Sequence, residues 1–430
     1  MRFGLTPLLV CASLLTAPVL AQGELRGHGG PVRALAVNGD AQQAISGSFD
    51  TSAIIWSLPR GSTLHVLRAH DSAVNAVLAL PQSGFATGGE DGQIAVWQAP
   101  DFSKPQIKIK VHEGPIAALA VSQNGSLIAS ASWDSSFAVT RLIDSTIQRF
   151  NLHQGNVNGV AFSRDDKSLI SIGYDATLRI TELASGQTRT ITLHTPLNAL
   201  AISPLGDLAA GGADGSLFLF APDGTPRHQI EAAEAPVLAL AFAADGTTIA
   251  AASPRGSVSL FDVASGKRLV TLNGPGLPVW SLAFTPDGRQ LLTGGGDAII
   301  RRWDARSGDH MGPLVPQSAA QVGPESDGSQ GAQVFKACAA CHSLTEQGGN
   351  RAGPSLYGVL GRRIGRAPGY VYSPDFASHD IVWTKETIAR LFELGPSVFT
   401  PGTKMPEQKL VSPQDREALV DFIERATQAR

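Results

Sequence analysis

Two cysteines and a histidine near the end of the chain have a spacing that can attach a cofactor. Cys338 and Cys341 are separated by two alanines, and His342 follows the second cysteine directly. A C-x-x-C-H run is typical of covalent c-type haem attachment. Each thiol forms a thioether with a haem vinyl group, and the histidine reaches the iron from one face. The run therefore predicts one covalent haem c, with its iron, as the cofactor.

The same residue types would also suit a redox dithiol or half of a zinc site. Zinc would need a second pair of ligands, and the one remaining cysteine, Cys11, falls in a predicted signal peptide. The strand–turn–helix pattern of a thioredoxin does not surround the run either. Haem attachment is therefore the preferred interpretation.

Six-coordinate haem iron needs a second axial ligand, and the chain offers few methionines for this role. Of its three methionines, Met1 is lost with the signal peptide. Met311 precedes the haem motif, whereas Met405 follows it in the segment PGTKMP (401–406). Methionine is usually core filler, but this polar, proline-flanked segment suits a loop that covers a haem face. We predict Met405 as the second ligand.

The first 21 residues have the pattern of a secretory signal peptide. Arg2 gives a positive start, residues 8–20 are mostly apolar, and Ala21 ends a cleavage site of small residues. The apolar run is too short to span a membrane, and no later stretch is long enough. We expect residues 1–21 to be removed on export and the mature protein to be periplasmic, with an uncleaved anchor as the alternative. Export agrees with the haem motif, because c-type haem is joined to its protein outside the cytoplasm.

The composition is that of a globular protein with more than one domain. The 430 residues are 43% hydrophobic and 17% charged, and the net charge is -3. This length suggests two or three domains. The near-neutral charge gives no reason to expect nucleic acid or an anionic membrane surface as a partner.

Residues 24–310 are built from a unit that recurs about every 40 residues, a period typical of propellers and arrays. Each unit alternates apolar strands with turns, as in Val32–Val37 and Val279–Phe284, and seven units can be counted. A histidine recurs at His28, His70, His112, His153 and His194. An aspartate recurs at Asp50, Asp91, Asp134, Asp175, Asp214 and Asp297. Because a residue repeated once per unit is spread around a ring, the histidines cannot converge on one ion, and we interpret them as structural.

This unit resembles the WD repeat, although at the end of the unit Trp-Asp itself survives only at Trp303-Asp304. The resemblance implies an all-β seven-bladed propeller over residues 22–310. It also implies that the repeat histidine and aspartate hydrogen-bond within each blade. A free sheet edge is a liability, so we expect residues 24–27 to form the outer strand of the last blade, with residues 308–315 as the competitor.

The composition and the predicted secondary structure of the chain change after the repeats. Residues 311–330 are rich in Pro, Gly and Ser, which is linker composition. A helix is expected over residues 332–340. A final helix is expected to begin at Pro413, with Ser412 as its N-cap.

Residues 331–430 resemble class I cytochromes c, and specifically the mitochondrial type. Besides the C-x-x-C-H run, the matching segments are GPSLYG (353–358), GRRIG (361–365), APGYVYS (367–373), IVW (381–383) and PGTKM (401–405). The resemblance implies an all-α class I cytochrome c domain, in which Cys338 and Cys341 bind the haem while His342 and Met405 ligate its iron.

The same resemblance assigns four supporting residues. The carbonyl of Pro354 would accept the other ring N–H of His342 and fix the tautomer of the ligand. Arg362, Tyr372 and Trp383 would hold the inner haem propionate, a carboxylate that is costly to bury without partners.

With His342 and Met405 filling both axial positions, the iron can exchange one electron but cannot easily bind a substrate. We therefore expect electron transfer from a redox protein donor to an acceptor, with the propeller as a scaffold that docks a partner near the haem. Two alternatives stay open: an oxidoreductase whose propeller binds a substrate or a second cofactor, and a haem-based sensor with a displaceable Met405. The histidines outside the repeat pattern are His65, His228, His310 and His379.

Overall fold

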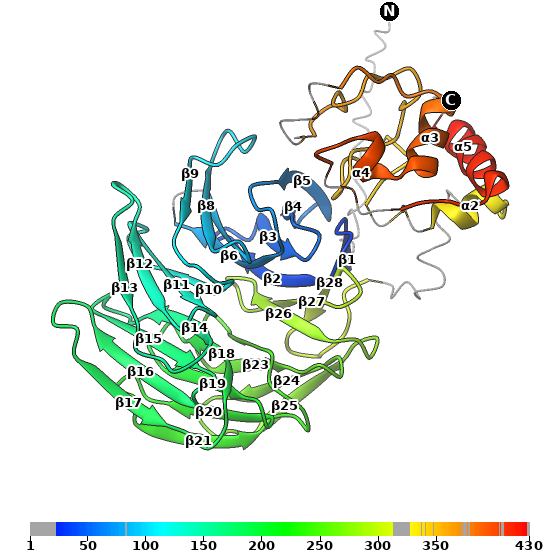
Figure 1. The fold of residues 1–430 in the computed structure, drawn as a ribbon. Coiled ribbons are helices and arrows are strands. Elements are labelled where there is room, and N and C mark those ends of the chain that lie inside the picture. The colour runs from blue at the N-terminus through cyan, green and yellow to red at the C-terminus, as the bar shows by residue number, and fades with distance from the viewer. Residues whose placement is uncertain are drawn as a thin grey trace, which may run out of the picture.

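The computed structural model describes residues 23–312 and 327–427, except 82–83, 337, 340, 347, 371, 373–375, 377–378, 404 and 406–407. The predicted signal peptide and most of the predicted linker lie outside the described residues. Within them, a ring of β-sheets is followed by a small helical domain that lies beside the first blade (Figure 1).

Seven four-stranded antiparallel sheets form the ring, as predicted. Blade one contains β2 (Val32–Val37), β3 (Gln43–Ser48), β4 (Ala53–Ser57) and β5 (Ser62–Leu67); blade two contains β6 (Val74–Leu80), β7 (Gly84–Gly89), β8 (Gln93–Gln98) and β9 (Ile107–Lys110); and blade three contains β10 (Ile116–Val121), β11 (Leu127–Ser132), β12 (Phe137–Arg141) and β13 (Ile147–Phe150). Blade four contains β14 (Val157–Phe162), β15 (Ser168–Gly173), β16 (Thr177–Glu182) and β17 (Thr188–Thr192), and blade five contains β18 (Leu197–Ile202), β19 (Leu208–Gly212), β20 (Ser216–Phe220) and β21 (Pro226–Glu231). Blade six contains β22 (Ala239–Phe242), β23 (Thr248–Ala252), β24 (Ser257–Asp262) and β25 (Arg268–Asn273), and blade seven contains β26 (Val279–Phe284), β27 (Gln290–Gly295), β28 (Ile299–Asp304) and β1 (Glu24–Arg26).

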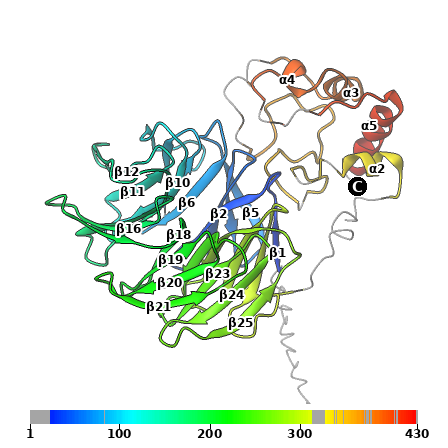
Figure 2. The ribbon, with the colours of Figure 1, turned by 60° about the horizontal axis from the view of Figure 1, so that its bottom comes forward.

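The ring is closed by the N-terminal strand. Strand β1 pairs antiparallel with β28, and Leu25 lies opposite Ile300 in the register. The prediction that residues 24–27 supply the outer strand is therefore confirmed. The described part of the competing segment, residues 308–312, meets the end of β28, where His310 forms an isolated bridge with Trp303. Both views place the helical domain beside β1 and β5, which means that closure brings blade one next to it (Figure 1, Figure 2).

Adjacent blades pack through apolar side chains at a spacing that small residues permit. Ile45 and Ile55 of blade one join Val74 and Phe85 of blade two in one buried cluster. At Gly47, a Cβ atom would lie 2.7 Å from the carbonyl oxygen of Val74 in the next blade. A larger residue at position 47 would therefore force the two blades apart.

The five repeat histidines are structural, as predicted. In blade one, His28 Nδ1 lies 2.9 Å from Asp50 Oδ2 and Nε2 lies 2.6 Å from Ser46 Oγ, which also accepts the indole N–H of Trp56 at 2.7 Å. The equivalent histidine–aspartate pairs are His70–Asp91, His112–Asp134, His153–Asp175 and His194–Asp214. Each pair ties the loop that enters a blade to a turn between its strands. The first four histidines are buried and find their partners inside their own blade, whereas His194 is exposed and meets Asp214 through Nε2.

The helical domain contains α2 (Gln330–Phe335), α3 (Lys385–Leu394), α4 (Pro396–Phe399) and α5 (Pro413–Thr427). Helix α5 begins where the sequence predicts, and the hydroxyl of Ser412 accepts the backbone N–H of Asp415 at 3.1 Å. Helix α2 is shorter than predicted: it begins at Gln330 and ends at Phe335, where the chain turns into the cysteine run. The rings of Phe335 and Phe422 meet at 5.5 Å and join α2 to α5. Among the helices that the structure describes, none is long and apolar enough to span a membrane.

The histidine–aspartate networks make a testable contribution to stability. Although burial alone would raise the pKa of Asp175, its hydrogen bonds with the Gln154 N–H, His153 and Thr177 outweigh burial and lower the pKa from 3.8 to about 2. This stabilisation is present above pH 3.8 and is lost as the pH falls towards 2. We expect Asp175→Ala to cost about 1–3 kcal/mol at neutral pH and to lose part of this acid sensitivity, as measured by urea unfolding across a pH series. Asp309→Ala, at an exposed turn outside these networks, is the control, and equal pH profiles for both variants would contradict the assignment.

Candidate haem site

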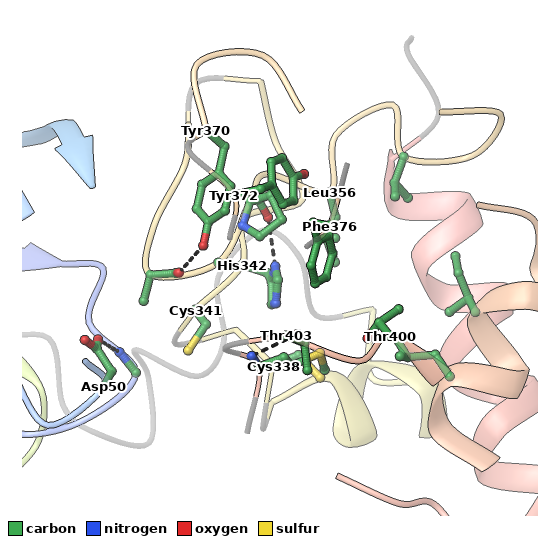
Figure 3. Close-up of a pocket in the computed structure, with 18 of the residues that line it drawn as sticks. Asp50, Cys338, Cys341, His342, Leu356, Tyr370, Tyr372, Phe376, Thr400 and Thr403 are labelled. Carbon is green, nitrogen blue, oxygen red and sulfur yellow. Dashed lines mark hydrogen bonds between the residues drawn. The ribbon is translucent and has the colours of Figure 1, made fainter. Parts of the chain in front are cut away.

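One cavity of about 470 Å³ lies between the helical domain and blade one. All eight predicted site residues line it: Cys338, Cys341, His342, Pro354, Arg362, Tyr372, Trp383 and Met405. Figure 3 shows the His342 ring extending into this space, with the two cysteine side chains below it and Tyr372 and Phe376 beside it. Residues that are far apart in the sequence are thus brought together around one cavity, although their individual roles as haem-binding groups stay predictions.

The turn after α2 orients the cysteine–histidine run. The backbone N–H groups of Cys341 and His342 both donate to the carbonyl of Cys338, at 3.1 and 3.0 Å. The chain therefore coils tightly here, and this turn aims both thiols and the imidazole at the same cavity. The side chain of Cys338 is buried and that of Cys341 is partly buried.

The predicted hydrogen bond that fixes the His342 ring is present. Its Nδ1 lies 2.8 Å from the carbonyl oxygen of Pro354. Because a carbonyl can only accept, Nδ1 carries the proton and the lone pair of Nε2 is left for a metal. Gly353 packs against the ring, where a Cβ atom would lie 2.3 Å from Cε1. Burial lowers the pKa of His342, so the imidazole is neutral, which is the form that binds iron.

The environment of the thiols does not favour zinc or dithiol chemistry. Burial raises the pKa of Cys338 to about 12 and that of Cys341 to about 11, where the nearby carboxylate of Asp50 adds to the effect. Both groups therefore stay protonated at neutral pH, whereas zinc binding and disulfide exchange use the thiolate. In the part of the chain that the structure describes, no three His, Cys, Asp or Glu residues are grouped to hold a metal ion.

The two methionines that follow the predicted signal peptide, Met311 and Met405, lie in different places. Met405 lines the cavity and packs against the buried core of the helical domain. Its loop is tied down by Thr403, whose N–H donates to Thr400 O at 3.1 Å and whose hydroxyl accepts the Met405 N–H at 3.1 Å. Met311, in contrast, donates its N–H to Arg302 O on the propeller. Of the two, only Met405 is positioned to meet a group bound in the cavity.

The three residues predicted for the propionate, Arg362, Tyr372 and Trp383, are among the polar residues of the lining. Arg362 donates to the carbonyl oxygens of Ser355 at 2.6 Å and Tyr357 at 3.2 Å. The backbone of Trp383 donates to Arg362 O at 2.9 Å. Among the described residues no carboxylate pairs with Arg362, and burial lowers the pKa of its guanidinium, so a bound anion would find a partly desolvated cation there. The donor set therefore fits a haem carboxylate.

The propeller side of the cavity was not predicted from the sequence. It is lined by Gly29, Gly30, Phe49, Asp50, Thr51 and Arg68, all from the loops of blade one. The repeat pattern assigns Asp50 only to the hydrogen-bond network of its blade, and nothing in the pattern distinguishes Arg68. Their place in the cavity could be predicted only by knowing where the helical domain lies on the ring.

The histidines outside the repeat pattern do not meet. The His65 ring lies 5.0 Å from the Phe102 ring and is tilted by 44° against it. The other three contact the backbone carbonyls of separate loops: His228 with Ala264, His310 with Gly312 and His379 with Pro401.

A seven-bladed propeller joined to a helical domain with a C-x-x-C-H run, a tautomer-fixed histidine and a facing methionine loop defines a propeller-linked c-type cytochrome. The comparison with known families agrees. The model described as WD domain, G-beta repeat, matches residues 21–57, 61–98, 103–139, 144–181, 185–220, 224–262 and 266–304, and the model described as Cytochrome c matches residues 329–427.

Individual relatives match the helical domain. The chain is 38% identical over 109 residues to cytochrome c of Arabidopsis thaliana, a match that covers 25% of this chain and 96% of the relative. It is also 38% identical over 104 residues to cytochrome c of Cochliobolus lunatus, covering 24% of this chain and 95% of the relative. The chain therefore belongs to the WD-repeat family and carries a domain of the cytochrome c family at its C-terminal end. Its cofactor is a covalently bound haem c with iron, and its domain supports electron transfer through that haem.

The assignment of Met405 can be tested by removing its sulfur. We expect Met405→Ala to lose the methionine–iron charge-transfer band and to lower the reduction potential, because a methionine ligand raises the potential of a haem. The readouts are the near-infrared edge of the oxidised spectrum and a redox titration. Met311→Ala removes the other methionine that follows the predicted signal peptide, and it should change neither readout. The same spectrum from both variants would exclude Met405 as the ligand.

Proposed function

We propose that this protein is a periplasmic electron carrier that passes single electrons through a haem ligated by His342 and Met405, with its propeller docking a redox partner. The observation that supports this most directly is the convergence of all eight predicted residues on one cavity. When bound, the haem accepts and releases one electron. The chain supplies a fixed imidazole, a methionine loop and a largely apolar lining that excludes water.

The rigidity of the lining favours electron transfer over substrate chemistry. Pro354 holds the His342 ring at 2.8 Å, and Thr403 holds the loop of Met405. Ligands that are held in one geometry change little between oxidation states, so an electron can be exchanged with little rearrangement. The periplasmic location is supported by the signal-like residues 1–21 and by the need to attach c-type haem outside the cytoplasm.

Exposed aromatic residues support partner docking on the propeller. Phe49, Trp133 and Tyr174 each precede a repeat aspartate, at the turn between the second and third strands of their blade. They are 41%, 39% and 56% exposed. Because Phe49 lines the haem cavity, the equivalent Trp133 and Tyr174 lie on the same end of the ring, which we call the haem-side face. Exposed aromatic side chains of this kind are enriched in protein interfaces.

The absorption spectrum of the purified full chain tests the carrier assignment. We expect a single low-spin c-type haem, oxidised and reduced, with no response to carbon monoxide, because both axial positions are filled. Ready carbon monoxide binding would favour a sensor. Absorption by a second cofactor would favour an oxidoreductase. Either result would overturn the proposal of a dedicated carrier.

The docking role is tested by the rate at which components of a periplasmic extract reduce the haem of the full chain. We expect Trp133→Ala combined with Tyr174→Ala to slow this reduction while leaving reduction by ascorbate unchanged, since ascorbate needs no docking surface. Ile143, which is 90% exposed at a turn on the opposite end of blade three, provides the control variant Ile143→Ala. Equal rates for the double variant and the wild type would remove the haem-side face as the docking surface.

A further inference from the structure

Blade one of the propeller contacts the cytochrome domain directly at the haem cavity. The backbone N–H of Ala352 donates to Gly27 O at 2.7 Å. Arg68 donates through Nε to the hydroxyl of Tyr370 at 3.0 Å and through Nη2 to the carbonyl of Ala352. Its guanidinium lies over the Tyr370 ring, 5.5 Å from the centroid. The two domains are thus joined by backbone, charge and stacking contacts at one place.

We propose that blade one is part of the haem site: Arg68 is a haem-site cation supplied across the domain boundary, and the loop at Gly29 covers the Cys341 side of the cofactor. This inference concerns the chain's own cytochrome domain, and it holds whether or not the propeller also docks an external redox partner.

The position of Arg68 carries the first half of the proposal. Its side chain lines the cavity, and its Nη1 is buried without a hydrogen-bond partner among the described residues. A buried, unpaired guanidinium nitrogen is costly and indicates that an acceptor belongs there.

The carboxylate that blade one itself contributes to the cavity is already occupied. Asp50 accepts hydrogen bonds from the His28 ring, the Gly29 N–H and the Ser52 hydroxyl. The haem carries carboxylates of its own, and its oxidised iron adds one positive charge that reduction removes. A fixed cation at Arg68 therefore favours the reduced state and raises the reduction potential.

The packing of Gly29 carries the second half. A Cβ atom at Gly29 would lie 2.1 Å from the Cys341 sulfur, and its next neighbours are 3.9 Å away. Figure 3 shows Asp50 of the propeller beyond the Cys341 sulfur, on the side away from His342. The edge of the cofactor that is bonded to Cys341 is therefore covered by the propeller in the docked arrangement.

The contact between Gly29 and Cys341 can be disrupted by a substitution that adds a single carbon atom, Gly29→Ala. Neither Gly29 nor Gly39 has the positive φ that would strain an alanine. At Gly39, on the same blade, a Cβ atom would meet nothing within 4 Å. The methyl group added by Gly29→Ala would therefore clash with Cys341 of the cytochrome domain, whereas the one added by Gly39→Ala would clash with nothing, which makes Gly39→Ala the matched control.

The experiment uses the haem-loaded full chain and two readouts. The first is the reduction potential of Arg68→Gln, Arg68→Lys and Arg60→Gln, where Arg60 is an exposed arginine at the opposite end of blade one. We expect Arg68→Gln to lower the potential, Arg68→Lys to restore most of it by keeping the charge, and Arg60→Gln to match the wild type. A potential for Arg68→Gln equal to that of the wild type would overturn the role of Arg68.

The second readout is the rate of haem reduction by ascorbate, which reports how open the covered edge is. We expect this rate to rise in Gly29→Ala and to stay at the wild-type value in Gly39→Ala. An unchanged rate in Gly29→Ala would mean that blade one does not shield the haem. Low-spin spectra in all variants show that the haem is intact, so failure here is distinguishable from failure of the electron-carrier proposal, which rests on that spectrum and on the carbon monoxide test.

Discussion

The antiparallel pairing of β1 with β28 is the interaction on which the arrangement of this molecule depends. Three residues at the start of the propeller complete its last blade, and the ion pairs of Arg301 with Glu24 and Asp297 reinforce the seam. After β28 the chain turns back, and His310 and Met311 pair with β28 before Gly312, so the chain is still at blade seven, which closure places next to blade one. The helical domain is therefore carried to the loops that contain Gly29 and Arg68. Without this seam, the last blade would have an open edge and the haem cavity would lack its propeller wall.

Most of the fold can be predicted from the sequence, and so can the residues that the cytochrome domain contributes to the haem cavity. Periodicity is enough for the propeller, because each histidine–aspartate pair, such as His28 and Asp50, is satisfied within its own blade and recurs with the repeat. The N-cap at Ser412 and the cysteine run are likewise local signals. The early end of helix α2 was not predictable from propensity, since the alanine-rich sequence favours continuation and the turn at Phe335 is imposed by the tertiary position of the run. The propeller wall could not be predicted either, because a contact between Arg68 and Tyr370 depends on how two domains meet rather than on any pattern within one of them.

Asp50 shows how one residue can serve two levels of organisation. Asp50 accepts hydrogen bonds from His28, Gly29 and Ser52, and these bonds hold the turn of blade one. Burial alone would raise the pKa of the Asp50 carboxyl, but the interactions with His28, Ser52 and Gly29 lower it. The same carboxylate lines the haem cavity and faces the sulfur of Cys341. Because it is fully engaged by its own blade, it can stand at a haem site as a fixed charge without collapsing onto Arg68. The repeat that builds the ring thus also sets part of the electrostatic environment of the cofactor.

The close packing of Gly29 on Cys341 has a consequence for the order in which the molecule is assembled. Thioether formation requires that the haem vinyl groups reach both sulfur atoms, and in the docked arrangement one of them is covered by blade one. The first strand of the ring is also the partner of the last, so the propeller cannot finish folding until residues up to Asp304 have been synthesised. Such long-range pairing is slow, and the cysteines follow soon afterwards along the chain. Because the docked propeller covers the Cys341 sulfur, we expect haem loading to precede the seating of the two domains.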